Sequence, residues 1–207
     1  MFPLFDSSGR IVGFSGRIFE KDVIGQKDAD AKYVNTPNTL FYDKSKLLYG
    51  FDRAKLEIRK QNAAILVEGQ MDLIMSHQAG VINAVAVSGT ALTPYHLNNI
   101  KRLADNLIMS FDMDAAGLMA SEKAIGLAFS HGFDVEALIL PQSKDPADLI
   151  RDNPDEWRKA VLCAEPVINF LLNILEKNSQ EPRIFRQEVE KRVLPHVAGI
   201  QSDIDRA

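Results

Sequence analysis

An alternation of short apolar runs with helical patterns between residues 63 and 141 constrains the fold more than any other feature. Four runs are almost continuously apolar, as expected of strands buried on both faces: AAILVEG, VINAVAVSG, NLIMSFD and DVEALILP. The segments between them have the apolar spacing of helices. Gly80 and Gly132 mark the ends of two of these helices, and Thr93 followed by Pro94 marks the start of another. This pattern predicts an α/β fold with a parallel sheet and helices on both of its faces.

The residues before the alternation predict a small mixed β/α segment. Two β-rich stretches surround the turn DSSG within residues 1–17, which predicts a hairpin. Residues 20–45 are polar and rich in turn formers, and we expect them to be irregular. Apolar spacing of three to four residues then predicts a helix from about Gly50 to Lys60.

The residues after Pro141 predict a small helical subdomain without a further strand. Its helical pattern is expected to break at four prolines, Pro154, Pro166, Pro182 and Pro195. The expected organisation is therefore 1–60, 61–150 and 151–207. The patterns at both ends stop without a cap or turn, as expected of a segment cut from a longer chain.

Composition excludes several classes of protein. No apolar run reaches the roughly 18 to 20 residues of a membrane span, and the first residues do not form a secretion signal, so we expect a cytoplasmic protein. One cysteine, Cys163, and four scattered histidines cannot form an intramolecular disulfide or a closed zinc site. Any metal site in this chain must therefore use oxygen ligands.

The net charge of -4 hides an uneven distribution. Residues 1–60 contain 11 Lys and Arg against 8 Asp and Glu, a net of +3, and residues 61–207 contain 13 against 20, a net of -7. Two interpretations have equal weight. The charges are ordinary solvated faces, or a basic segment holds phosphates beside an acidic segment that holds a metal ion.

Polar side chains follow three of the four predicted strands. Glu68 ends the first strand, Ser88 to Thr90 end the second, and Asp112 and Asp114 end the third. Ligands of open parallel sheets bind at the carboxyl ends of strands, so these carboxylates are expected to converge. Carboxylates without nearby His or Cys suit Mg²⁺ or Mn²⁺.

Each aspartate also has a structural interpretation. Asp112 or Asp114 would be an ordinary cap for the helix that begins near Ala115, although a cap does not explain Glu68. In KDPADLI, Asp145 either widens the metal site or caps a helix with Pro146 at its first position, and the two interpretations have equal weight.

The succession ILVEGQMDLI, AVSGTALT, SFDMDAAG and KDPADLI resembles the TOPRIM domain, and most closely that of the bacterial DnaG-type primases. The phrases FPLFDSSGRIVGFSGR, KYVNTP and YDKSKLLYGF resemble the segment that precedes TOPRIM in the RNA-polymerase core of those primases. Each motif alone is short, but their combination and order, covering residues 2–207, are highly specific.

The resemblance implies a DNA primase, a DNA-directed RNA polymerase that makes short RNA primers on single-stranded DNA from ribonucleoside triphosphates. It implies that Glu68 is the catalytic TOPRIM glutamate and that Asp112, Asp114 and Asp145 hold Mg²⁺ (or Mn²⁺). Arg17, Lys32 and Lys44 fall on basic positions that bind nucleic acid and nucleotides. The family's zinc module and its helicase-interacting domain, which contacts the replicative helicase, are absent from these residues.

The sequence also departs from the family pattern. An aromatic residue often stands at the position of Gln70, a small residue at that of Met113, and an acidic residue at that of Ala147. The last change removes one expected ligand of a second metal, with Asp148 as the nearest substitute. Two alternatives stay open: a strand-cleaving TOPRIM enzyme, for which the four tyrosines lack the expected setting on a separate domain, and a non-catalytic binding module.

Overall fold

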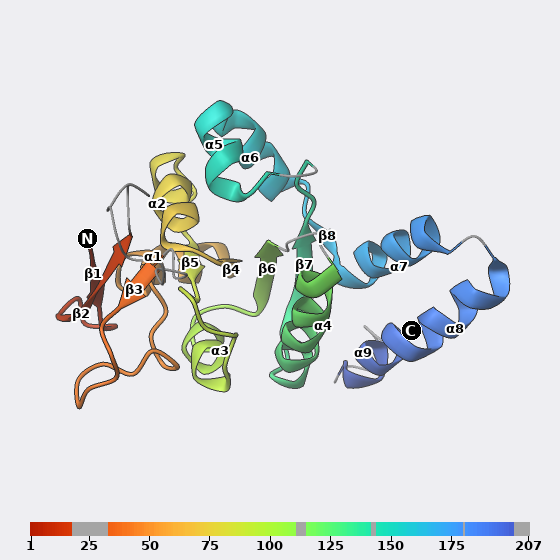
Figure 1. Ribbon diagram of the computed structural model, residues 1–207, viewed down its shortest axis with the longest axis horizontal. Coiled ribbons are helices and arrows are strands. Elements are labelled where there is room, and N and C mark those ends of the chain that lie inside the picture. The colour runs from red at the N-terminus through yellow and green to blue at the C-terminus, as the bar shows by residue number, and fades with distance from the viewer. Residues whose placement is uncertain (18–32, 111–114, 142–143, 180, 201–207) are drawn as a thin grey trace, which may run out of the picture.

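Two sheets and the helices around them form the protein (Figure 1). The computed structural model describes residues 1–17, 33–110, 115–141, 144–179 and 181–200, with the backbone alone for 115–120. The α/β class predicted from the sequence is confirmed, because a mainly parallel sheet lies at the centre with helices packed on both of its faces.

The N-terminal sheet is antiparallel, in the order β1-β2-β3. It consists of β1 (Phe2–Phe5), β2 (Ile11–Arg17) and β3 (Tyr33–Asn35). The predicted hairpin is confirmed, and its turn is held by Asp6, whose carboxylate accepts hydrogen bonds from two backbone N–H groups. The expectation that residues 20–45 are irregular was wrong for β3. Three residues are too few to show an alternating pattern, and they form a strand only because β2 supplies a partner.

The central sheet has the strand order β5-β4-β6-β7-β8. Its parallel strands are β4 (Ala63–Val67), β5 (Ala84–Ala86), β6 (Asn106–Ser110) and β7 (Asp134–Leu138). The edge strand β8 (Glu165–Pro166) pairs antiparallel with β7 and corrects the expectation that no strand follows Pro141. Two residues carry no periodic signal, and proline is tolerated there because the strand lies at an edge.

The helices begin and end near the predicted signals. Gly50 precedes the first helix with a left-handed φ of 79°, and Thr93 caps the third by accepting a hydrogen bond from His96 N. Prolines stand in the first turn of α5, α6, α8 and α9. The described helices are α1 (Phe51–Gln61), α2 (Gln70–Gln78), α3 (Pro94–Lys101), α4 (Ala115–Ser130), α5 (Pro146–Asp152), α6 (Pro154–Leu162), α7 (Val167–Asn178), α8 (Pro182–Arg192) and α9 (Leu194–Gly199).

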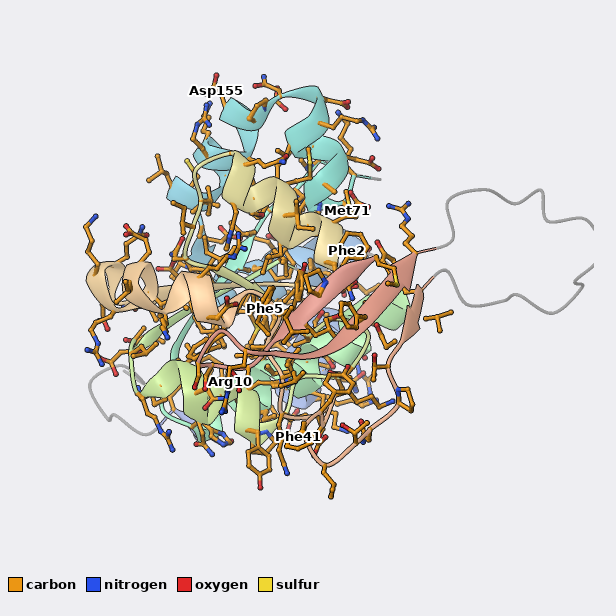
Figure 2. The ribbon with its side chains drawn as sticks, turned by 90° about the vertical axis from the view of Figure 1, so that its left-hand side faces the viewer. Phe2, Phe5, Arg10, Phe41, Met71 and Asp155 are labelled. Carbon is orange, nitrogen blue, oxygen red and sulfur yellow. The ribbon has the colours of Figure 1, made fainter. Side chains whose placement is uncertain are left out.

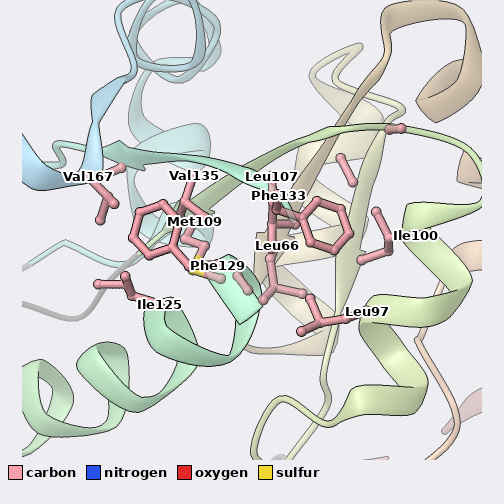
Figure 3. Packing of buried hydrophobic residues seen from close by; sticks show 14 of the residues in the cluster. Leu66, Leu97, Ile100, Leu107, Met109, Ile125, Phe129, Phe133, Val135 and Val167 are labelled. Atoms are coloured by element: carbon pink, nitrogen blue, oxygen red, sulfur yellow. The ribbon is translucent and has the colours of Figure 1, made fainter. Parts of the chain in front are cut away.

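Each face of the central sheet carries its own hydrophobic core, because side chains alternate along a strand. On one face Leu66, Leu107 and Met109 pack against α1, α3, α4 and α7, and Figure 3 shows these three between residues of α3 and α4. On the other face Ile65 and Val67 pack with α2, α5, α6 and residues from the N-terminal segment such as Leu4. The N-terminal sheet is therefore anchored on the same face as α2 and α5.

The C-terminal helices extend this arrangement away from the N-terminal sheet (Figure 1). Arg192 of α8 donates to the Glu122 carboxylate of α4 over 2.6 Å, which ties the two helices together. Within the described residues no helix combines the length and apolar character needed to cross a membrane.

His96 adds a pH-dependent contribution to this fold. Its side chain is fully buried, and Nδ1 accepts a hydrogen bond from Thr93 N over 3.3 Å. Burial disfavours the charged ring and lowers the pKa of His96 to about 4. In the unfolded chain the ring binds a proton near its ordinary pKa of 6.5, so the stabilisation is complete above that pH and is lost as the pH falls toward 4.

We expect His96 to lower the free energy of unfolding by about 2 kcal/mol when the pH falls from 7.5 to 5. Urea unfolding of the parent and of His96→Asn at both pH values measures the effect. The parent should lose about 2 kcal/mol more than the variant, because the other acidic and basic groups titrate equally in both. Equal losses would show that His96 is protonated in the folded protein at pH 5.

Candidate functional site

A cavity of about 660 Å³ lies between the N-terminal sheet, the carboxyl ends of β4 and β5, and the first turns of α2 and α5. Arg17 and Tyr33 enter it from the N-terminal sheet, Glu68 from the end of β4, and Asp145 from the start of α5. Figure 2 looks onto the N-terminal sheet and labels Phe2 of β1 and the cavity residue Met71 of α2. Three of the sequence-predicted site residues, Arg17, Glu68 and Asp145, therefore line one cavity.

Glu68 occupies the position that the strand pattern predicted. It follows Val67 at the end of β4, its side chain is exposed, and its carbonyl oxygen accepts a hydrogen bond from Ser88 N over 2.9 Å. Strand β6 runs parallel beside β4, with Leu66 opposite Met109. Strand β6 consequently ends at the same edge of the sheet as β4. Asp112 and Asp114 come after β6 in the sequence and lie outside the described residues, so their placement stays a prediction.

Asp145 is the N-cap of α5. Its Oδ1 accepts a hydrogen bond from Asp148 N over 2.7 Å, and Pro146 follows at the first helical position. The capping interpretation is therefore confirmed. A carboxylate has a second oxygen and lone pairs beyond those of the cap, and Asp145 lines the cavity together with Glu68, so its role as a metal ligand stays a prediction.

Asp72 is a cavity residue that the sequence analysis did not single out. It is 9% exposed, and its carboxylate accepts two backbone hydrogen bonds, one from Gly69 N over 2.9 Å and one from Ala147 N over 3.2 Å. The first closes the N-terminus of α2, and the second joins α2 to α5. An aspartate three residues after Gly69 is the available sequence signal, since this spacing is that of a capping box.

The basic residues are distributed unevenly around the cavity. Arg17 lines it, and its guanidinium lies over the Tyr33 ring at 5.7 Å from the ring centre. Lys44 is exposed on the loop before α1, outside the cavity lining, and Lys32 lies outside the described residues. Arg151 of α5, which the sequence analysis did not select, also lines the cavity and pairs with Asp148 over 2.8 Å.

The donor set fits a divalent cation only in part. In the portion of the chain that the structure describes, no three His, Cys, Asp or Glu side chains stand close enough to hold an ion. Carboxylate oxygens are the chemistry that Mg²⁺ requires, and Glu68 and Asp145 supply them at the correct edge of the sheet. Asp112 and Asp114, the other predicted ligands, lie outside the described residues, so the metal site stays a prediction.

Comparison with known proteins places this geometry among characterised ones. The family described as Toprim-like matches residues 65–150, and the family described as DNA primase catalytic core, N-terminal domain, matches residues 1–55. The DNA primase of Campylobacter jejuni is 43% identical over 152 residues, which are 73% of this chain and 24% of that protein. The chain spans about a quarter to a third of the length of the curated relatives it matches.

Solved structures agree with the sequence comparison. A DNA primase domain from Pseudomonas aeruginosa superposes with a TM-score of 0.82 at 31% identity, covering 100% of this chain and 64% of that one. A DnaG primase catalytic domain bound to single-stranded DNA superposes with a TM-score of 0.81 at 30% identity, again covering 100% of this chain and 64% of the other. The fold of this chain is therefore shared with these proteins over essentially its whole length.

Asp72 is expected to matter for stability because its loss leaves two backbone N–H groups without their acceptor. Asp72→Ala should lower the free energy of unfolding by about 3 kcal/mol, measured by urea denaturation. Asp155→Ala is a matched control: it removes an exposed acidic residue from the first turn of α6 (Figure 2) and should cost less than about 1 kcal/mol. Similar losses in the two variants would contradict the linking role of Asp72.

Proposed function

The chain belongs to the family of DnaG-type DNA primases and contains their TOPRIM domain, and from this premise we propose that it forms the catalytic part of a primase. The reaction is the synthesis of short RNA primers on single-stranded DNA from ribonucleoside triphosphates. One observation carries the proposal: the cavity brings Arg17 of β2 together with Glu68 at the end of β4 and Asp145 at the start of α5. A phosphate-binding cation and acidic groups for metal and proton chemistry therefore share one site.

TOPRIM primases are metal-dependent as a family, and we propose Mg²⁺, or Mn²⁺, for this chain. Asp112, Asp114 and Asp145 would hold the ion. A bound divalent cation would neutralise the charge of the triphosphate and of the departing pyrophosphate. Ala147, at a position that is commonly acidic in the family, adds no carboxylate to this set, and its backbone N–H donates a hydrogen bond to Asp72.

The residues of the chain divide the remaining work. We propose that Glu68, exposed at the end of β4, takes up the proton of the primer 3′-hydroxyl as that oxygen attacks the α-phosphorus of the incoming nucleotide. Arg17, Lys32 and Lys44 would bind phosphates of the nucleotide and of the template. Such contacts hold a strand without reading its sequence.

The proposed partners and location follow from the same family membership. One of the similar structures is described as bound to single-stranded DNA, which supports a single-stranded DNA template here. We propose that a replicative helicase is contacted through a domain outside these residues and that the protein acts in the cytoplasm.

The strand-cleaving alternative needs an accessible tyrosine nucleophile. Tyr42 and Tyr49 are 4% and 8% exposed, and burial raises the pKa of both hydroxyls, which keeps them protonated. Tyr33 does line the cavity, with its ring against the Arg17 guanidinium, and Tyr95 is on α3, outside the cavity lining. Tyr33 belongs to the N-terminal sheet, whereas a cleaving TOPRIM enzyme is expected to carry its tyrosine on a separate domain, so we propose polymerisation over cleavage.

Glu68→Gln tests the proposed reaction, since glutamine keeps the size of the side chain but cannot take up the proton. In a primer-synthesis assay with template, ribonucleotides and Mg²⁺, the whole protein should lose roughly a hundredfold in rate or more, while template affinity changes little. Glu156→Gln makes the same change on the exposed surface of α6 and should leave the rate unchanged. Primer synthesis by Glu68→Gln within a few-fold of the parent would remove Glu68 from the mechanism.

The basic positions are tested by the salt dependence of binding to a labelled single-stranded oligonucleotide. Each of Arg17→Ala, Lys32→Ala and Lys44→Ala should reduce the slope of log affinity against log salt by about 0.7 to 1. Lys60→Ala, an exposed lysine at the end of α1, serves as the control and should leave the slope unchanged. An unchanged slope in the triple variant would show that these residues do not contact phosphate.

A further inference from the structure

Gln70 joins three segments of the chain through a buried polar network. Its amide Nε2 donates to Ser15 Oγ over 3.0 Å and to Ser88 Oγ over 2.5 Å. Ser15 lies on β2, Gln70 is the first residue of α2, and Ser88 lies in the turn after β5. The three side chains are 0%, 3% and 9% exposed. Both hydrogens of the Gln70 amide are therefore used in hydrogen bonds.

The network connects the elements that carry the proposed site. Ser15 stands two residues before Arg17 on the same strand, so both side chains face the same side of the N-terminal sheet. Gln70 stands two residues after Glu68, across the turn between β4 and α2. The Ser15–Gln70 hydrogen bond therefore fixes the strand that ends in Arg17 against the turn that carries Glu68.

Ser88 makes the third connection, and its backbone is strained. Its φ of 53° lies in the left-handed region, which non-glycine residues enter at a cost. Ser88 N donates to the Glu68 carbonyl oxygen over 2.9 Å, while its hydroxyl is held by Gln70. Strain of this kind persists only where surrounding contacts hold it, and here these contacts come from Glu68 and Gln70.

We propose that Gln70 is a positioning residue that sets the placement of Arg17 relative to Glu68 across the cavity. An aromatic residue, which often stands at this position in the family, could not donate two such hydrogen bonds, so the network depends on the glutamine of the present chain. The role assigned to Gln70 rests on the proposed function for the meaning of Arg17 and Glu68, but the contacts themselves do not depend on it.

A double-mutant cycle separates positioning from simple stabilisation. Gln70→Met keeps the length of the side chain and removes both donors, and Gln78→Met makes the same change at the exposed end of α2. Binding of the labelled single-stranded oligonucleotide is measured for the parent, Gln70→Met, Arg17→Ala and the double variant. Urea denaturation checks that each variant is folded under the assay conditions.

Gln70→Met should weaken binding by about fivefold in the parent, and by less than about twofold once Arg17 is already alanine. Ser15→Ala should reproduce this pattern, and Gln78→Met should have no effect. The positioning role would be overturned if Gln70→Met weakened binding equally with and without Arg17, or if Arg17→Ala had no effect on binding. Either result would leave the proposed function in place as long as the parent synthesises primers.

Amide hydrogen exchange provides a readout that needs no substrate. Gln70→Met and Ser15→Ala should each accelerate exchange of Ser88 N–H by about tenfold relative to Gln78→Met, because local opening becomes easier. A parent chain that fails to bind the oligonucleotide would count against the proposed function, and the exchange experiment would still decide on Gln70. Unchanged exchange at Ser88 in both variants would overturn the proposal.

Discussion

The parallel pairing of β4 with β5 and β6 is the constraint on which the rest of the structure depends. Parallel neighbours end at the same edge of a sheet, so β4, β5 and β6 end together there. Because both faces of these strands are buried under helices, a slip of one residue would move every side chain to the wrong core. The register that buries Leu66 and Ile65 on opposite faces therefore also places Glu68 at the edge.

The cavity exists because a second sheet is fixed against that edge. Leu4 anchors the N-terminal sheet in the core on the α2 side, and Gln70 holds its second strand by a buried hydrogen bond. Asp72 closes the opposite wall by accepting hydrogen bonds from the starts of α2 and α5. Gln70 and Asp72 both lie in the first turn of α2. Gln70 links α2 to the strand that carries Arg17, and Asp72 links α2 to the start of α5, where Asp145 lies.

The basic and acidic residues of the cavity come from different parts of the chain. Arg17 belongs to the net-positive first 60 residues, and Glu68, Asp72 and Asp145 belong to the net-negative remainder. Their meeting in one cavity favours the interpretation in which phosphate-binding and acidic segments face each other, over that of unrelated solvated surfaces. The acidic wall is itself partly neutralised by Arg151, which pairs with Asp148.

The sequence by itself determined the parallel α/β core, the helix cap at Thr93 and the place of Glu68 at a strand end, whereas it left Asp145 open between a helix cap and a metal ligand. These features follow from local rules, namely apolar runs for buried strands, capping side chains at helix starts, and the common edge of parallel strands. Only the tertiary structure decided the strands β3 and β8, the linking role of Asp72 and the network of Gln70. Each of these depends on a partner far away along the chain, such as Ser15 for Gln70 and Ala147 for Asp72. No local pattern encodes which distant backbone or hydroxyl group will come within hydrogen-bond distance.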